Sequence, residues 1–149
     1  MSPQFLDTNV LLYAYDPSDA DRHARASELV LHLARTRQAA ISVQVMQEFY
    51  VNTVAKIAQP LPPDRARLRL EAFTRWYVYT PLPADVTTAA EWSQRHQLSF
   101  WDAMIVLAAS RSHCDVLWSE DLSAGQTIEG VTIRNPFNDG VDAPTITQA

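Results

Sequence analysis

Short runs of strand-forming residues alternate along this chain with longer segments whose apolar residues recur at helical spacing. The short runs lie at 5–6, 39–43, 77–80, 115–119 and 130–134, and helical patterns lie at 10–15, 22–37, 44–58, 64–76, 83–96 and 103–109. Strands joined through helices predict parallel crossover connections, with the helices packed against the sheet. This alternation therefore predicts an α/β fold.

The size and composition of the chain predict one compact domain. It has 149 residues, of which 47% are apolar and only three are glycine, so it can bury a sizeable core. A proline-rich break at 59–63 is interpreted as an insertion within one fold, and the chain is polar from 138 onward. We expect a single domain over 1–137 and a polar C-terminal tail over 138–149.

No apolar run approaches the roughly 20 residues of a membrane span, and the N-terminus lacks a signal-peptide pattern. We therefore expect a cytoplasmic protein without membrane contact. The net charge of −5 argues against a protein that simply coats nucleic acid. An enzyme that gathers acids in one cleft would still be acidic overall, so nucleic acid is not excluded as a substrate.

Four acids stand where strands end or where helices begin. Asp7 follows the first strand-like run, Glu48 lies in the first turns after 39–43, Asp102 opens an apolar helix, and Asp121 follows 115–119. Because the carboxyl ends of parallel strands meet at one edge of a sheet, we expect these acids to converge. Each also has a structural explanation, as a helix cap, a first-turn acid or part of a capping box with Ser99.

Carboxylates held close together repel one another, and their pKa values rise unless cations neutralise them. A hard divalent ion, Mg²⁺ or Mn²⁺, prefers oxygen ligands and is often shared with a substrate phosphate. One or two such ions would lower the pKa of a bound water and stabilise charge at phosphorus. The sequence thus nominates Asp7, Glu48, Asp102 and Asp121 as catalytic residues, with Asp7, Asp102 and Asp121 as metal ligands.

Polar residues adjoin these acids. Thr8, Asn9 and Ser119 can donate hydrogen bonds beside them, and we assign these three residues to orienting the ligands or the substrate. Glu120 stands next to Asp121 and can replace it as a ligand or assist it. Adjacent residues usually point in different directions, so the sequence does not choose between the two.

A second group of candidates follows the proline-rich break. Asp64 is expected to cap a helix in which Arg65, Arg67 and Arg69 alternate with aliphatic and aromatic residues. Arginines interleaved with aromatics can grip single-stranded RNA by charge and stacking, or contact a partner protein. An amphipathic helix that packs on a neighbour or on a second subunit explains the pattern equally well.

The acid-bearing segments together resemble one known family, the PIN domain, and within it most closely a VapC-type toxin of a bacterial toxin–antitoxin pair. The resemblance covers the chain from about residue 7 to 137 and rests on Phe5-Leu6-Asp7-Thr8-Asn9-Val10-Leu11, Glu48, Trp101-Asp102-Ala103 and Ser119-Glu120-Asp121-Leu122. It implies a three-layer fold with a parallel sheet of four to five short strands flanked by helices. It also implies a ribonuclease dependent on magnesium or manganese that cuts single-stranded or loop RNA.

The same resemblance implies a homodimer, held inactive by an antitoxin whose C-terminal segment lies across the active site. Carried over by position, Asp7, Glu48, Asp102 and Asp121 become the acidic cluster. Thr8 or Ser119 becomes the hydroxyl at the site. Glu120 departs from the pattern, in which Asn or another polar residue is more usual.

Two other functions are compatible with these residues. An aspartyl phosphatase would use Asp7 as a covalent nucleophile, but such sites usually recruit a lysine, and the only lysine, Lys56, lies far along a helix. A non-catalytic interaction module would keep the same fold and use the acids only as caps. Manganese-dependent stabilisation that is lost in Asp7→Asn would distinguish the enzyme from such a module.

Overall fold

The computed structural model describes residues 1–138, which form one mixed sheet with helices on both sides. The strands lie in the order β3-β2-β1-β4-β6-β5, and every neighbouring pair is parallel except β5 and β6. Their bounds are β1 (Gln4–Leu6), β2 (Ala39–Ser42), β3 (Tyr77–Tyr79), β4 (Val116–Trp118), β5 (Thr127–Ile128) and β6 (Val131–Arg134). The predicted α/β fold with a mostly parallel sheet is confirmed.

The sheet has six strands where four to five were expected. The additional strand, β5, has only two residues and lies outside the five strand-like runs of the sequence. It pairs with β6 through a two-residue turn at Glu129 and Gly130, whose φ angles of 49° and 82° are both positive. Turns of this kind match the twist of an antiparallel hairpin. A two-residue strand is too short to produce a detectable alternation of apolar and polar residues.

Within residues 1–138, six helices connect the strands. They are α1 (Thr8–Tyr15), α2 (Ala20–Arg35), α3 (Val43–Ala55), α4 (Pro63–Phe73), α5 (Pro83–His96) and α6 (Phe100–Arg111). The expectation that Asp64 caps α4 is wrong: Pro62 occupies the cap position without a side-chain hydrogen bond, and Asp64 lies within the first turn. Pro63 explains the start, because its fixed φ suits the first helical position and its missing N–H is not needed there.

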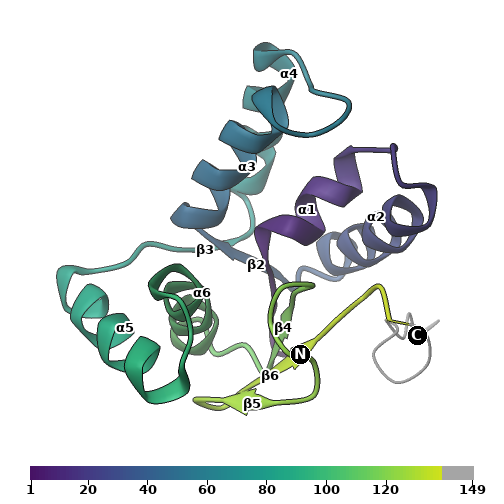
Figure 1. Ribbon diagram of the computed structural model, residues 1–149. Helices are drawn as coiled ribbons and strands as arrows, with labels where there is room; N and C mark the ends of the chain where they lie inside the picture. The colour runs from purple at the N-terminus through teal and green to yellow at the C-terminus, as the bar shows by residue number, and fades with distance from the viewer. Residues whose placement is uncertain (139–149) are drawn as a thin grey trace.

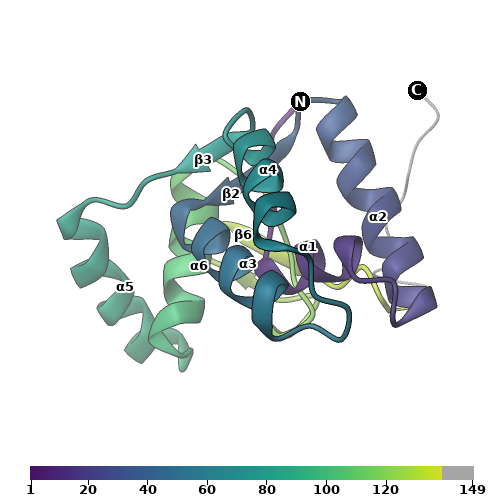
Figure 2. The same ribbon diagram turned by 90° about the horizontal axis from the view of Figure 1, so that it is seen from above.

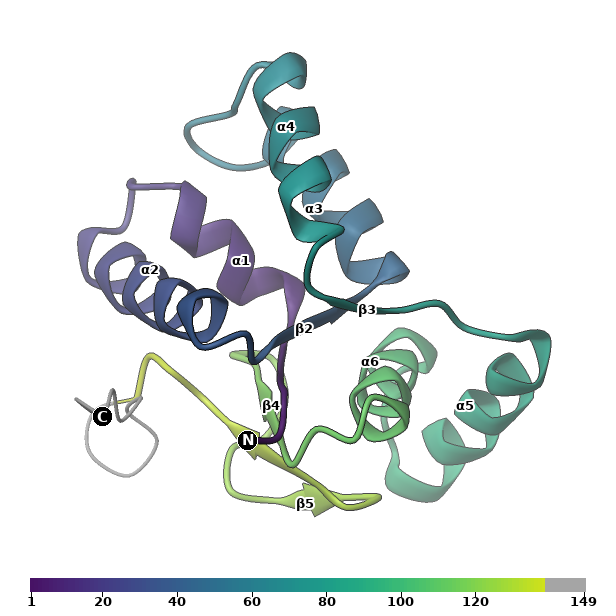
Figure 3. The same cartoon turned by 180° about the vertical axis from the view of Figure 1, so that it is seen from behind.

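The helices form layers around the sheet. Helices α1 and α2 lie on one side and α5 and α6 on the other, while α3 and α4 project together from the edge that contains β2 and β3 (Figures 1 and 2). The view from behind shows the same separation (Figure 3). Helix α6 is the most deeply buried, since all seven residues from 103 to 109 are buried. No helix within residues 1–138 is both long and apolar enough to cross a bilayer.

The tail expected over 138–149 lies, apart from its first residue, outside the described residues.

Aromatic rings join α1, α3 and α4. Phe73 lies 5.0 Å from Phe49, 6.1 Å from Tyr15 and 4.7 Å from Trp76, measured between ring centroids. Phe49 and Phe73 are fully buried, and edge-on aromatic pairs add to the free energy gained by burying their area. This cluster holds the projecting α3–α4 pair against α1.

Replacing Phe73 by alanine should lower the free energy of unfolding by about 3–5 kcal/mol, because it leaves a cavity between three helices. Urea denaturation monitored by circular dichroism measures the change. Glu71→Ala, at an exposed position of the same helix, is the matched control and should alter stability by less than about 0.5 kcal/mol. A loss below about 1 kcal/mol in Phe73→Ala would show that the cluster does not anchor α4.

Candidate active site

The pairing of β1 with β4 positions two residues of the site, Asp7 and Ser119. In the β1–β4 pair Leu6 is opposite Trp118, and the next backbone N–H, that of Asp7, donates to the Trp118 carbonyl at 3.0 Å. The residues that follow the two strands are therefore neighbours. The Ser119 hydroxyl donates to Asp7 Oδ2 at 2.8 Å, and both side chains are buried.

Asp7 is both a helix cap and a buried acid. Its Oδ1 accepts a hydrogen bond of 2.7 Å from the backbone N–H of Thr8, which begins α1. Only 5% of the residue is exposed. Burial raises the pKa of Asp7 to about 7, and the charges of Asp121 and Glu48 act in the same direction, against the hydrogen bonds from Ser119 and Thr8.

Glu48 reaches the same region from α3. Its Oε1 accepts a hydrogen bond of 2.6 Å from the Thr8 hydroxyl, and its Oε2 accepts one of 3.4 Å from Gln44. Gln44 also donates to the Trp101 carbonyl at 3.4 Å, beside the start of α6. Sequence reasoning missed Gln44, although its position four residues before Glu48 on one helix face was a usable signal.

Asp102 approaches from the first turn of α6. Its backbone N–H donates to the Ser99 hydroxyl at 3.0 Å, so the cap expected from the sequence is present. The side chain is half-buried, and burial raises its pKa, helped by the charges of Asp121 and Glu48. Asp102 therefore shares the electrostatic environment of the other acids.

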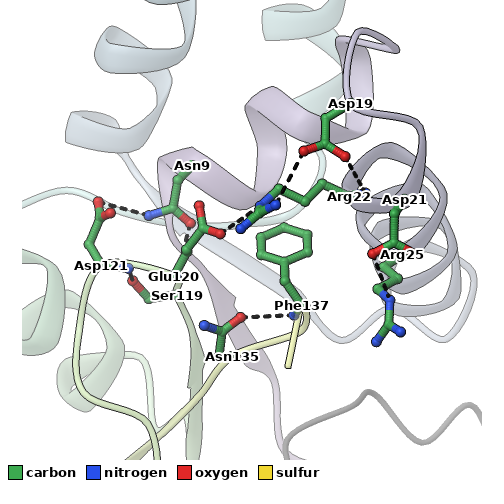
Figure 4. A network of polar contacts seen from close by, with 10 residues as sticks. All are labelled: Asn9, Asp19, Asp21, Arg22, Arg25, Ser119, Glu120, Asp121, Asn135 and Phe137. Carbon is green, nitrogen blue, oxygen red and sulfur yellow. Dashed lines mark hydrogen bonds and ion pairs between the residues drawn. The ribbon is translucent and has the colours of Figure 1, made fainter. Parts of the chain in front are cut away.

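Asn9 connects Asp121 to Asp7. Its amide nitrogen donates to Asp121 Oδ2 at 3.0 Å and, more weakly, to Asp7 Oδ2 at 3.4 Å, and its Oδ1 accepts from the Glu120 backbone N–H at 3.2 Å. The adjacent Glu120 carboxylate points the other way, toward Arg22, which donates to it at 2.7 Å (Figure 4). Of the two neighbouring acids, Asp121 is the one directed toward Asn9.

The arginines nominated on α4 do not join this cluster. Arg65, Arg67 and Arg69 are exposed, and the guanidinium of Arg69 lies 5.1 Å from the ring centroid of Tyr15. Tyr15 ends α1, whereas the acids gather at its beginning, about 12 Å away at 1.5 Å per residue. Any contact of these arginines with RNA or a partner would lie beyond the acid cluster.

The oxygen donors of the acid cluster determine which cation could bind there. Within residues 1–138 no three His, Cys, Asp or Glu side chains converge closely enough to form a ready-made metal site. The donor set nevertheless suits a hard ion, since it consists of carboxylates whose mutual charge contributes to the raised pKa values of Asp7 and Asp102. A cation among them would remove that repulsion. The residues fit such an ion chemically, and side-chain rotation would have to complete its coordination.

The fold and the site define an α/β protein with acids gathered at the carboxyl edge of a parallel sheet. The family model for the PIN domain matches residues 5–126, and the chain therefore belongs to the PIN domain family. Among curated proteins, no sequence match is significant.

Solved structures similar to this chain include the following three. VapC20 of Mycobacterium tuberculosis, described as a Sarcin-Ricin loop cleaving toxin, has a TM-score of 0.58 and 21% identity, over 76% of this chain and 85% of that one. A toxin–antitoxin complex from Klebsiella pneumoniae has a TM-score of 0.62 and 22% identity, over 87% of this chain and 95% of that one. VapBC2 of Rickettsia felis, bound to promoter DNA, has a TM-score of 0.59 and 18% identity, over 89% of this chain and 97% of that one. At these identities the likeness shows a shared fold.

Asp7→Asn should stabilise the metal-free protein above neutral pH. Because the folded-state pKa of Asp7 is about 7 against an ordinary 3.8, the folded chain binds more protons between these values, and wild-type stability falls as pH rises through that window. Asparagine removes this loss but weakens the Ser119 contact. A rise of about three pKa units corresponds to about 4 kcal/mol, since one unit corresponds to about 1.4 kcal/mol. The weaker Ser119 contact offsets part of this, so we expect a net gain of about 2 kcal/mol at pH 8.

Urea denaturation between pH 4 and pH 8, with a chelator present, measures this effect. Asp115→Asn, which removes an exposed carboxylate at the opposite edge of the sheet, is the control and should change stability by less than about 0.5 kcal/mol. A variant Asp7→Asn that is less stable than wild type at pH 8 would contradict the proposed cost of burying this charge.

Proposed function

We propose that this protein is an endoribonuclease dependent on Mg²⁺ or Mn²⁺ that acts as the toxin of a toxin–antitoxin pair. The observation that carries the proposal is that the charges of Asp121 and Glu48 raise the pKa values of both the buried Asp7 and the half-buried Asp102, in a PIN-family fold. RNA as the substrate is supported by the description of the similar VapC20 as a toxin that cleaves the Sarcin-Ricin loop. The proposed substrate also implies action in the cytoplasm.

In this proposal Asp7, Asp102 and Asp121 hold one or two divalent ions. When bound, such an ion supplies a water of lowered pKa and neutralises charge on the phosphodiester. Ser119 and the Thr8 backbone N–H fix the orientation of the Asp7 carboxylate, while Asn9 does the same for Asp121.

Glu48 is the remaining acid, and we assign it to proton transfer. Its Oε1 is held by the Thr8 hydroxyl, whereas the 3.4 Å contact of its Oε2 with Gln44 is at the limit of a hydrogen bond. That second oxygen can take a proton from the attacking water. A carboxylate suits this role when its position is fixed by neighbours, because geometry decides which proton it can reach.

The alternative of an aspartyl phosphatase is less well supported. Lys56, the only lysine, is the C-cap of α3, eight residues beyond Glu48 and thus about 12 Å further along the helix. The alternative of a non-catalytic module is addressed by the cleavage experiment below.

An antitoxin and a second copy of the chain are the proposed protein partners. One of the similar structures is described as a toxin–antitoxin complex, and another is VapBC2 bound to promoter DNA. Large apolar side chains are exposed on the projecting pair of helices, Val51 on α3 and Leu68 on α4. We propose that the antitoxin covers the acid site with its C-terminal segment and that two toxin chains form a homodimer.

Asp102→Asn should reduce RNA cleavage by about 100-fold or more, since even residues that only support a metal ligand cost 10–100-fold when removed. The assay incubates the purified chain with a pool of cellular RNAs, with and without Mn²⁺, and maps the cut ends. Asp115→Asn is the matched control, with the same change at an exposed position across the sheet, and should cleave like wild type.

Two results would contradict the proposal. Cleavage by Asp102→Asn at the wild-type rate with metal present would remove this residue from the site. A wild-type chain that neither cleaves RNA nor shows a Mn²⁺-dependent rise in melting temperature would favour the interaction module.

The triple substitution of Arg65, Arg67 and Arg69 by alanine tests the exposed face of α4. If these residues contact phosphates, RNA binding should weaken and the dependence of log Kd on log salt should flatten by up to about 2–3 units. Fluorescence anisotropy with a catalytically inactive Asp102→Asn background measures this slope. An unchanged slope would remove the three arginines from the RNA interface.

A further inference from the structure

The loop that follows β4 carries two adjacent acids with different surroundings. Asp121 faces Asn9, whereas the neighbouring Glu120 accepts a 2.7 Å hydrogen bond from Nε of Arg22 on α2 (Figure 4). Arg22 and Glu120 are 98 positions apart in the sequence. This contact links the start of α2 directly to the loop that carries a candidate metal ligand.

Arg22 is held in place from several sides. One of its terminal nitrogens, Nη1, lies 3.2 Å from Asp19 Oδ2, and its Cζ lies 5.6 Å and 5.5 Å from the ring centroids of Tyr13 and Phe137. These two rings contact each other edge-on, with their centroids 5.1 Å apart. A guanidinium packed against two aromatic rings keeps its plane and direction, which a lysine ammonium would not.

The exposure of this ion pair indicates what it can do. The side chains of Arg22 and Glu120 are 39% and 23% exposed, and pairs so accessible to water contribute little to global stability. Its effect is therefore local and concerns the direction of the Glu120 carboxylate. Without Arg22, the Glu120 carboxylate would lose its cationic partner, and its negative charge would stand uncompensated one residue before Asp121.

The loop is otherwise fixed by only a few hydrogen bonds. The Glu120 backbone N–H donates to Asn9 at 3.2 Å, and the Asp121 and Leu122 backbone N–H groups donate to the Ser119 hydroxyl at 3.1 and 3.4 Å. Asn9 and Ser119 are the same residues that contact Asp7. A shift of Glu120 would therefore disturb the donors that hold the acid cluster together.

We propose that Arg22 is a positioning residue for the acid site: packed against Tyr13 and Phe137 and paired with Glu120, it turns that carboxylate outward and fixes the loop so that Asp121 faces Asn9, which also contacts Asp7. Phe137 makes the segment after β6 part of this support. The inference rests on the proposed function only in so far as Asp121 is a metal ligand. The arrangement of the loop itself can be measured without RNA or metal.

The experiment compares wild type with Arg22→Gln, Glu120→Gln and the double variant. Backbone amide exchange of residues 119–122 reports loop order without metal, and calorimetric titration with Mn²⁺ alone reports the cation affinity. We expect Arg22→Gln to speed amide exchange at least five-fold and to weaken Mn²⁺ binding about ten-fold. Adding Glu120→Gln should restore most of both, because it removes the unpaired charge.

Controls separate positioning from folding and from substrate contact. Arg25→Gln breaks an ion pair with Asp21 one turn further along α2, at a side chain that points away from Glu120, and should leave both readouts at wild-type values (Figure 4). Arg22→Lys keeps the charge but not the planar contact with the rings and should give intermediate values. Circular dichroism confirms that each variant is folded.

The possible results are distinguishable. Wild-type amide exchange in Arg22→Gln, or failure of Glu120→Gln to restore it, overturns the positioning role. An effect of Arg22→Gln on RNA binding alone, with loop exchange and Mn²⁺ affinity unchanged, also overturns it and makes Arg22 a substrate contact. If wild type binds no Mn²⁺, the proposed function fails, and the amide-exchange comparison still decides whether Arg22 orders the loop.

Discussion

Burial of the Asp7 carboxylate is the constraint on which the rest of the site depends. An ionised carboxylate removed from water loses its hydration, which is why burial raises the pKa of Asp7 to about 7. Three donors reduce this cost: the Thr8 backbone N–H, the Ser119 hydroxyl and the Asn9 amide. Each of these residues also contacts a second acid or the loop that carries one. The donors that stabilise the buried Asp7 carboxylate therefore also position the neighbouring acids.

The acids could be predicted from the sequence because their signals are local. Asp7 and Asp121 follow apolar strands, and Glu48 and Asp102 lie near the beginnings of helices, so each stands out within a short window. The rule that parallel strands present their carboxyl ends at one edge then turns four local signals into a prediction of convergence. That prediction needed no knowledge of strand order. It needed only the alternation of strands and helices, which is visible in the apolar patterns along the whole sequence.

The features that sequence reasoning missed depend on contacts that no local pattern encodes. The Arg22–Glu120 pair joins residues 98 positions apart, and its geometry depends on Phe137, at the far end of the described chain. The strand β5 exists only because β6 is available to pair with it. Asp64 has the residue type of a cap, but the prolines before it start the helix earlier. In each case a tertiary or backbone constraint overrode a local preference.

Capping and function are often treated as competing explanations of an acid at a helix start, yet Asp7 does both with different oxygens. Its Oδ1 accepts from the first N–H of α1, and its Oδ2 accepts from Ser119, which follows β4. Capping also gives the carboxylate one orientation, which is useful to any ligand that binds it. A cap alone does not require the surrounding charges, since Ser or Asn caps a helix equally well. The nearness of Asp121 and Glu48 raises the cost of ionising Asp7 and does not help the helix; the cation of the proposed function would offset this cost.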